Sequence, residues 1–329
     1  MKNYKKNLIK LYKDSFDDSL EFIDYFFKTV YKKANVVSFF KDGICISALH
    51  LVPKKIRYQN KIINCPYIVG AATLENFRTN GYMGSVIKKA FDKLFRRGNV
   101  LTALYPFKHS FYEKFGFKTI SYSTVFETKA KTADSFYQKT DDAKKLLEIY
   151  NSYFKDYDIY IYRDLKFMRL KLNECLVDNG TAFYNDTNYI LYSLGTVGEA
   201  VVTNPENLNF LDVDNTKVFL PSTKISQTPY VMARIINVKK LLKIIPYTCS
   251  DCTVNLKIKD EIIAKNNVNL SLNIVRGKCK VELSKEFDYE ISIENFTALI
   301  FGSYKNSENF PKKLMEIFPV KKTFLYDQI

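Results

Sequence analysis

The stretch that decides the fold runs from Tyr67 to Gly84 and reads YIVGAATLENFRTNGYMG. Its first part, Tyr67 to Leu74, is an apolar, β-rich run, and a turn containing Gly81 then enters the strongest helical pattern of the chain. Apolar residues recur at helical spacing from Gly84 to Arg97, and Val100 to Tyr105 has the composition of a buried strand. The sequence therefore predicts a strand, a helix and a second strand parallel to the first.

The turn before this helix has the features of a phosphate-binding turn. A glycine-containing entry leaves backbone N–H groups free at the helix N-terminus, where the helix dipole favours an anion. Gly81 and Gly84 permit close approach to the backbone, and Arg78 adds a positive charge. The same spacing also fits an ordinary strand-to-helix turn, so the pattern alone leaves both interpretations open.

The flanking segments predict a mixed α/β protein of three parts. Residues 7–31 carry two helical patterns, and residues 36–58 predict antiparallel strands around the turn signal Lys41-Asp42-Gly43. Further helix and strand patterns follow to the end of the chain. The chain turns polar near residue 130, and a Pro-Ser-Thr-Lys stretch follows near residue 225, so we expect units at 1–129, 130–225 and 226–329.

The composition excludes general disorder and a membrane-spanning chain. The chain has 329 residues and a mass of 38.4 kDa, with 47% hydrophobic and 15% aromatic residues. No segment approaches the ~18–20 apolar residues of a membrane helix, and no apolar signal core follows Met1. We therefore expect a soluble, cytoplasmic protein without a membrane partner.

Charge and cysteine content add little about partners. The net charge of +15 favours anionic partners, but the lysines are spread along the chain, so nucleic acid is the weaker interpretation. The six cysteines are too sparse and irregular for a disulfide framework, so we expect reduced thiols. Cys249-Ser250-Asp251-Cys252 is an isolated pair, and we expect no metal site.

The run from Val69 to Phe117 resembles the acetyl-CoA-binding motif of the GCN5-related N-acetyltransferases (GNAT family), and more closely the Eis (enhanced intracellular survival) branch. The turn beginning at Arg78 matches that branch, as does the S-x-Y-x-x-F-G pattern of Ser110 to Gly116. Residues 230–238 and 322–329 are similar to the start and end of the branch's C-terminal sterol-carrier-like domain. The resemblance implies an α/β (α+β) chain with a GNAT domain, a reduced second GNAT-like region and an SCP2-like α+β domain.

The resemblance also implies an enzyme, an N-acetyltransferase that moves acetyl directly from acetyl-CoA to a primary amine. The amine would belong to a polyamine, an aminoglycoside-like molecule or a lysine side chain, including a protein lysine. The reaction must deprotonate the amine, stabilise the oxyanion and protonate the leaving thiolate. Tyr112 is protonated at neutral pH, and the resemblance assigns it the last task. The resemblance assigns the general base to the chain's terminal carboxylate, here that of Ile329, with Asp327 as a substitute.

The cofactor contacts carry over by position in the motif. The residues expected to contact coenzyme A are Ala71, Ala72, Thr73, Arg78, Thr79, Asn80, Gly81, Tyr82, Met83, Gly84, Phe107 and Lys108. The strand residues among them would pair with the pantetheine arm, and one N–H would face the thioester carbonyl. His109 stands where relatives often carry proline, and both a base and a surface histidine remain open for it.

Acceptor recognition is less determined by the sequence. An acidic group near the N-terminus could attract a cationic amine, or it could cap a helix. Its members are Asp14, Asp17, Asp18, Glu21 and Asp24. The alternative function is a non-catalytic lipid- or partner-binding protein with a vestigial coenzyme A site, and the chain could also form a homo-oligomer.

Overall fold

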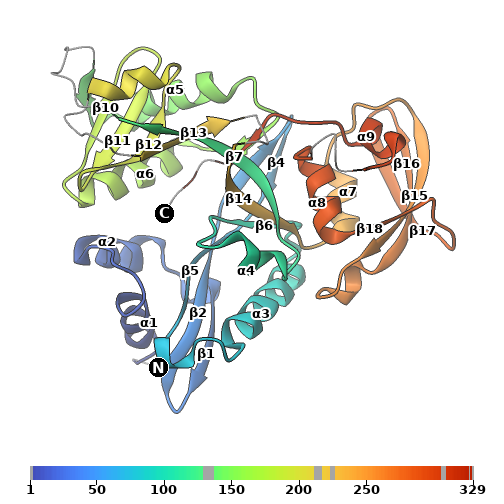
Figure 1. Cartoon of the computed structure of the whole chain (residues 1–329), viewed down its shortest axis with the longest axis horizontal. Coiled ribbons are helices and arrows are strands. Elements are labelled where there is room, and N and C mark those ends of the chain that lie inside the picture. The colour runs from blue at the N-terminus through green and yellow to red at the C-terminus, as the bar shows by residue number, and fades with distance from the viewer. Residues whose placement is uncertain are drawn as a thin grey trace.

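The computed structural model describes residues 3–128, 137–210, 217–222, 227–304, 309–325 and 327. Figure 1 shows three lobes: an N-terminal lobe in blue and teal, a middle lobe in green and yellow, and a C-terminal lobe in orange and red. Strands labelled β7 and β14 run through the region where the three lobes meet.

A seven-stranded sheet forms the centre of the molecule, in the order β1-β2-β5-β6-β14-β7-β13. Neighbouring strands are antiparallel except for β5 and β6, which are parallel and are connected through helix α3. The predicted strand, helix and parallel strand are therefore confirmed. The bounds are β1 (Val36–Lys41), β2 (Ile44–Val52), β5 (Tyr67–Thr73), β6 (Leu101–Leu104), β7 (Lys118–Glu127), β13 (Lys217–Ser222), β14 (Thr228–Ile235) and α3 (Tyr82–Arg96).

Helices cover both faces of the N-terminal part of this sheet. Successive β1 residues point to opposite faces, so Val36 packs with the first helices of the chain and Val37 packs with α3. The apolar stripe of α3 is buried at no more than 1% exposure from Val86 to Leu94. The other elements are α1 (Asn3–Lys13), α2 (Leu20–Tyr25), the π-helix η1 (Phe26–Val30), the 3₁₀ turns η2 (Lys33–Asn35) and η3 (Glu75–Phe77), and α4 (His109–Glu113).

The middle lobe pairs a four-stranded antiparallel sheet with two helices. The sheet has the order β12-β11-β10-β8, and the helices begin at side-chain caps provided by Asp142 and Asp164. The bounds are β8 (Gln138–Thr140), α5 (Ala143–Phe154), α6 (Leu165–Val177), β10 (Thr181–Tyr184), β11 (Tyr189–Ser193), β12 (Thr196–Val201) and the 3₁₀ segment η4 (Pro205–Phe210).

The C-terminal lobe packs a second four-stranded sheet, in the order β17-β16-β15-β18, against helices. Its elements are α7 (Val238–Ile244), β15 (Cys252–Lys259), η5 (Ala264–Asn266), β16 (Val268–Val275), β17 (Lys278–Leu283), β18 (Tyr289–Ser292), α8 (Ile293–Phe301) and α9 (Lys312–Ile317). No helix in the described ranges combines the length and the apolar character needed to cross a lipid bilayer.

Several strands join regions that are far apart in the sequence. β14 comes from the last third of the chain but lies between β6 and β7 in the central sheet. A small sheet, β19-β9-β3-β4, unites all three predicted units, and its bounds are β3 (Lys55–Tyr58), β4 (Lys61–Asn64), β9 (Ile159–Ile161) and β19 (Thr323–Phe324). Pro221, expected at a unit boundary, lies in β13, where the sheet edge tolerates a residue without an N–H group. The three-unit division stays a prediction.

Residues 323–325 and 327 are docked between the lobes. Phe324 stacks on Tyr230 with 5.3 Å between ring centroids, and the Leu325 N–H donates to the Ser121 hydroxyl at 3.0 Å. Asp327 forms a buried ion pair with Lys54, the residue before β3, and the Lys171 ammonium of α6 lies 3.9 Å from its other oxygen. The side chains of Lys54 and Asp327 are each 1% exposed. Together with Lys171 they form a buried charged cluster that joins the N-terminal lobe, the middle lobe and residue 327.

We expect Asp327→Ala to lower the free energy of unfolding by about 3–5 kcal/mol, because Lys54 would remain buried without its carboxylate. Urea denaturation followed by circular dichroism measures the loss. The double variant Lys54→Met/Asp327→Leu removes both charges and should recover most of it. Asp24→Ala breaks the exposed pair with Lys28 and serves as the control, with an expected loss of at most about 1 kcal/mol. Equal losses for Asp24→Ala and Asp327→Ala would contradict this account of the tail.

Candidate active site

The central sheet opens between its two parallel strands. Within β5 and β6, both fully described, the only paired residues are Tyr67 and Ala103. The rest of β5, from Ile68 to Thr73, continues without a β6 partner, while β6 keeps its pairing with β14 on the opposite edge. The strands therefore diverge toward their C-terminal ends and leave backbone groups of β5 open to a ligand.

A β-bulge on β5 lies beside this opening. On β2, Ala48 and His50 pair with Ala72 and Val69, so β5 holds one extra residue over the same distance. Gly70 at the bulge has φ +56°, and a Cβ there would lie 3.0 Å from the Tyr12 ring. The bulge therefore requires glycine and redirects the neighbouring peptide groups. Gly70 was not among the predicted site residues, although a lone glycine within a strand pattern signals such a bulge.

His50 is part of an aromatic cluster behind the bulge. Its ring meets Phe26 edge-on at 5.1 Å and lies 5.8 Å from the ring of Phe27. Burial lowers the pKa of His50 to about 4, so its imidazole is neutral at pH 7. A base with so low a pKa is a weak proton acceptor at that pH, so we assign His50 a packing role.

The turn after β5 is held by its own hydrogen bonds. The Arg78 Nε donates to the Thr73 carbonyl at 3.2 Å, which ties the turn to the end of β5. The side chains of Thr79 and Asn80 both donate to the Arg78 carbonyl. Thr79 and the helix cap Gly81 both adopt left-handed backbone conformations, with φ of 65° and 76°. The predicted turn residues are thus brought together at the N-terminus of α3.

No side-chain capping bond satisfies the N–H groups at the start of α3. Gly81 makes no side-chain capping bond, and α3 has no acidic residue in its first turn. The first N–H groups of a helix lack intrahelical acceptors, so those of Tyr82, Met83 and Gly84 are available to an anion. A Cβ on Gly84 would lie 3.4 Å from the Phe115 ring, which keeps the helix start close to α4. This uncapped turn beside an open strand fits the pyrophosphate and pantetheine parts of coenzyme A.

Tyr112 lies on α4, at the side of the opening formed by β6. It is 3% exposed and belongs to the packed cluster that contains Ile68 and Leu104, against which Ala71 and Met83 also pack. Burial raises the pKa of Tyr112 to about 12, so its hydroxyl keeps its proton at neutral pH.

The remaining predicted residues near α4 flank Tyr112. Phe107 is 73% exposed, and its ring centroid lies 5.7 Å from that of Tyr112. Lys108 is the N-cap residue of α4 but makes no side-chain capping bond. The Nε2 atom of His109 is buried without a hydrogen-bond partner in the described residues, and burial lowers the pKa of this histidine.

The predicted base, Ile329, lies outside the described residues. Asp327, the substitute, is described, and its contacts argue against that role. The ammonium groups of Lys54 and Lys171 hold the pKa of the Asp327 carboxyl below its usual range. A carboxylate stabilised in this way accepts a proton poorly, so Asp327 acts as an anchor for the tail.

The N-terminal helices and α6 face each other across a partly acidic contact. The Tyr12 hydroxyl donates to Asp18 at 2.8 Å, and Ser19, which bonds Asp178 of the middle lobe, caps α2. The helix-cap interpretation of the acidic group is therefore wrong for Asp18. The neighbouring Glu174 is mostly buried, with its carboxylate 3.3 Å from Lys171, and burial raises its pKa. Glu174 and Lys171 were missed because nothing local in α6 distinguishes them from surface charges.

A small cavity lies beside this contact. It has a volume of about 350 Å³ and lies between α2, η1 and the end of α6. Its lining residues are Glu21, Asp24, Tyr25, Lys28, Thr29 and Val177. The Tyr25 hydroxyl donates to the Leu170 carbonyl and holds the two elements together. This side of the molecule can accommodate a cationic group.

The whole chain shares its fold with solved structures of acyltransferase type. A conserved protein from Enterococcus faecalis, described as a probable N-acyltransferase, aligns over 100% of this chain and 98% of its own at 15% identity, with a TM-score of 0.78. A GCN5-related N-acetyltransferase from Anabaena variabilis aligns over 99% and 97% at 14% identity, with a TM-score of 0.74. Eis1 from Mycobacterium abscessus aligns over 98% and 96% at 12% identity, with a TM-score of 0.69. None of the curated proteins matches the sequence.

The sequence itself identifies the N-terminal lobe. Residues 2–120 match the family model of the acetyltransferase (GNAT) domain, and this range includes the open strand β5, the uncapped start of α3 and Tyr112. The mixed α/β fold agrees with that match. Residues 2–120 are therefore a GNAT acetyltransferase domain, and the protein is an acetyltransferase that uses acetyl-CoA as its donor.

Proposed function

We propose that the protein is an N-acetyltransferase of the Eis-like branch that acetylates a primary amine of a polyamine, an aminoglycoside-like molecule or a lysine side chain. The observation that carries the proposal is the opening between β5 and β6, flanked by the uncapped N-terminus of α3 and by Tyr112. An SCP2-like C-terminal domain and a cytoplasmic location are part of the same proposal.

The donor would be held along β5 and the start of α3. Acetyl-CoA supplies an acetyl group already activated as a thioester. The N–H groups of Gly81 to Gly84, together with Arg78, Thr79 and Asn80, would hold its phosphates. Ala71, Ala72 and Thr73 would bond the pantetheine amides, and an N–H beside the bulge would face the carbonyl oxygen. Phe107 and Lys108 would contact the donor from the side of α4.

Two groups would move protons. Tyr112 would protonate the leaving sulfur, because its pKa of about 12 keeps the hydroxyl protonated across the neutral range. The terminal carboxylate of Ile329 would accept the proton of the amine. The ion pair of Asp327, two residues earlier in the sequence, supports this role because it fixes residue 327 between the lobes.

The acceptor would bind between α2 and α6. A primary amine is cationic before it reacts, and Asp18 and Glu174 provide carboxylates near the Tyr12 ring, which itself lies against the Gly70 bulge. At the adjoining cavity the exposed residue Glu21 would attract further positive charge, whereas Asp24 is paired with Lys28. This distribution favours acceptors with more than one amine. The non-catalytic alternative is not favoured, because the acetyltransferase family match covers the lobe that carries this site.

Thiol release from acetyl-CoA tests the proposal directly. The full chain is incubated with polyamines, aminoglycosides and lysine-containing peptides, and free coenzyme A is measured with a thiol reagent. We expect release that depends on one of these amine classes, with mass spectrometry showing one added acetyl group. The proposal would be contradicted if no amine caused thiol release and coenzyme A did not raise the melting temperature of the protein.

We expect Tyr112→Phe to reduce kcat by about 10²–10⁴-fold, the usual contribution of a positioned general acid. The affinity for coenzyme A should stay unchanged, because the substitution removes only the hydroxyl. Wild-type rates should show no alkaline loss from this residue until the pH approaches 12. Phe111→Leu on the same helix is the control for packing, and a Tyr112→Phe rate within twofold of wild type would exclude the acid role.

A chain lengthened by a few residues after Ile329 should lose turnover while keeping coenzyme A binding, because the carboxylate would no longer stand at the proposed position. The control carries the same added residues at the N-terminus, before Met1. Turnover is measured by thiol release and binding by calorimetry. Normal turnover of the C-terminally extended chain would remove the terminal carboxylate from the mechanism.

A further inference from the structure

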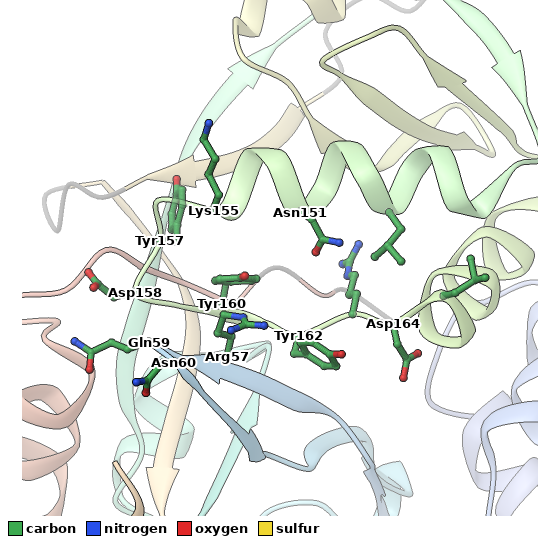
Figure 2. Close-up of a pocket in the computed structure, with 13 residues that line it drawn as sticks. Arg57, Gln59, Asn60, Asn151, Lys155, Tyr157, Asp158, Tyr160, Tyr162 and Asp164 are labelled. Atoms are coloured by element: carbon green, nitrogen blue, oxygen red, sulfur yellow. The ribbon is translucent and has the colours of Figure 1, made fainter. Parts of the chain in front are cut away.

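A cavity of about 880 Å³ lies between the middle lobe and the β3–β4 hairpin. Figure 2 shows α5 along one side and, along the other, the strand residues Arg57 and Tyr160 together with Tyr162, which follows β9. The lining residues include none of those proposed to bind acetyl-CoA or the amine. Its volume lies within the ~300–1,000 Å³ that is usual for small-molecule sites.

The register of two strands builds one wall of this cavity. Arg57 on β3 pairs with Tyr160 on β9, so both side chains project from the same face of the small sheet. The alternate residues Tyr58, Ile159 and Ile161 point to the other face and are at most 1% exposed. The sheet thus presents a polar and aromatic face to the cavity while its other face is fixed in the core.

Two polar atoms in this wall have no hydrogen-bond partner in the described part of the chain. They are the Nε donor of Arg57 and the Oε1 acceptor of Gln59, and both are shielded from solvent. Leaving a buried donor or acceptor unbonded costs about 1–3 kcal/mol. A ligand that offers an acceptor to Arg57 and a donor to Gln59 would recover this cost after small side-chain rotations.

Arg57 is the group of this wall that suits an anion. Both carboxylates of the wall are occupied by backbone donors: Asp158 accepts the Lys322 N–H, and Asp164 accepts the Phe167 N–H, each at 2.8 Å. Arg163 is neutralised by Glu199 through two hydrogen bonds. Arg57, in contrast, has no ion pair with a carboxylate in the described part of the chain, so its guanidinium can pair with an incoming anion.

The apolar part of the wall consists mainly of tyrosine rings. Tyr157, Tyr160 and Tyr162 line the cavity, and the Arg57 guanidinium lies 5.8 Å from the Tyr162 ring centroid. Asn151 points from α5 toward these residues in Figure 2, whereas Lys155 extends away from the strands at the rim. Aromatic rings beside a guanidinium that has no ion-pair partner in the described residues suit a planar body that carries a negative group.

We propose that this cavity binds a small organic anion, whose carboxylate or phosphate pairs with Arg57 and whose planar body lies against the tyrosine rings. The donor required by Gln59 would come from a hydroxyl or amino group of the same molecule. The site is separate from the acetyl-transfer site and does not depend on the proposed function.

Calorimetric titration of the full chain with two probes tests the site and separates the two anion types. Adenosine 5′-monophosphate carries a phosphate, and 4-hydroxybenzoate carries a carboxylate. Adenosine and 4-hydroxybenzamide are their uncharged counterparts. Excess desulfo-coenzyme A is present throughout, so that the donor site is occupied. We expect at least one anion to bind tenfold or more tightly than its uncharged counterpart. Equal affinities within both pairs would overturn the proposal.

Two substitutions locate the binding. Arg57→Gln should weaken the bound anion at least tenfold, and so should Asn151→Trp, which fills the cavity from an exposed position on α5 and spares the sheet. Lys144→Gln on the same helix does not line the cavity and should leave the affinity unchanged. Unchanged affinity in both cavity variants would overturn the assignment. An inactive protein that still binds the anion through Arg57 would contradict the proposed function and support this site.

Discussion

The structure depends on the parting of two parallel strands in the middle of a sheet. Unpaired backbone groups inside a sheet are costly, so such a gap persists only where both strands are held from their other sides. β2 holds β5, with a bulge at Gly70, and β14 holds β6 through four consecutive residue pairs. The backbone of β5 that remains unpaired is the part nearest the start of α3. The parting of β5 and β6 therefore brings the gap, the uncapped start of α3 and Tyr112 into one place.

Buried charges fix how the lobes meet around this gap. Lys54, Lys171 and Asp327 come from three distant parts of the chain, and Arg234 of β14 bonds both Asp260 and the Phe115 carbonyl at 2.6 Å. A buried ion pair adds little stability compared with apolar residues of the same size, but an unpaired buried charge is very unfavourable. These pairs therefore disfavour every other packing of the lobes. The Arg234 bond also holds the end of α4, and with it Tyr112, against the C-terminal lobe.

Local features of the sequence were sufficient to predict much of the fold. Helices α5 and α7 follow apolar spacing and begin at the side-chain caps Asp142 and Asn237, and both features are local signals. The neighbouring strands β4 and β5 are separated at Pro66 and join different sheets, which their own composition does not indicate. The place of β14 between β6 and β7 could not be predicted, because an apolar strand does not encode its distant partners.

The site residues also differ in whether the local sequence is sufficient to predict them. The α3 turn and Tyr112 lie in one continuous segment and were found through its motif. Lys54 and Glu174 gain their significance only where lobes meet, so nothing in their own neighbourhoods marks them.

The domain that matches the family lacks several elements that surround this site. Residues 2–120 contain β5, β6 and α3 but lack β14, the strand that keeps β6 in the sheet. They also lack Asp327, so Lys54 would be left without its buried partner. The proposed base lies two residues beyond that anchor, at the very end of the chain. Donor binding could therefore arise from local structure near α3, whereas proton removal from the amine would require all three lobes and the docked tail. If the proposed base is correct, acetyl transfer depends on completion of the whole fold.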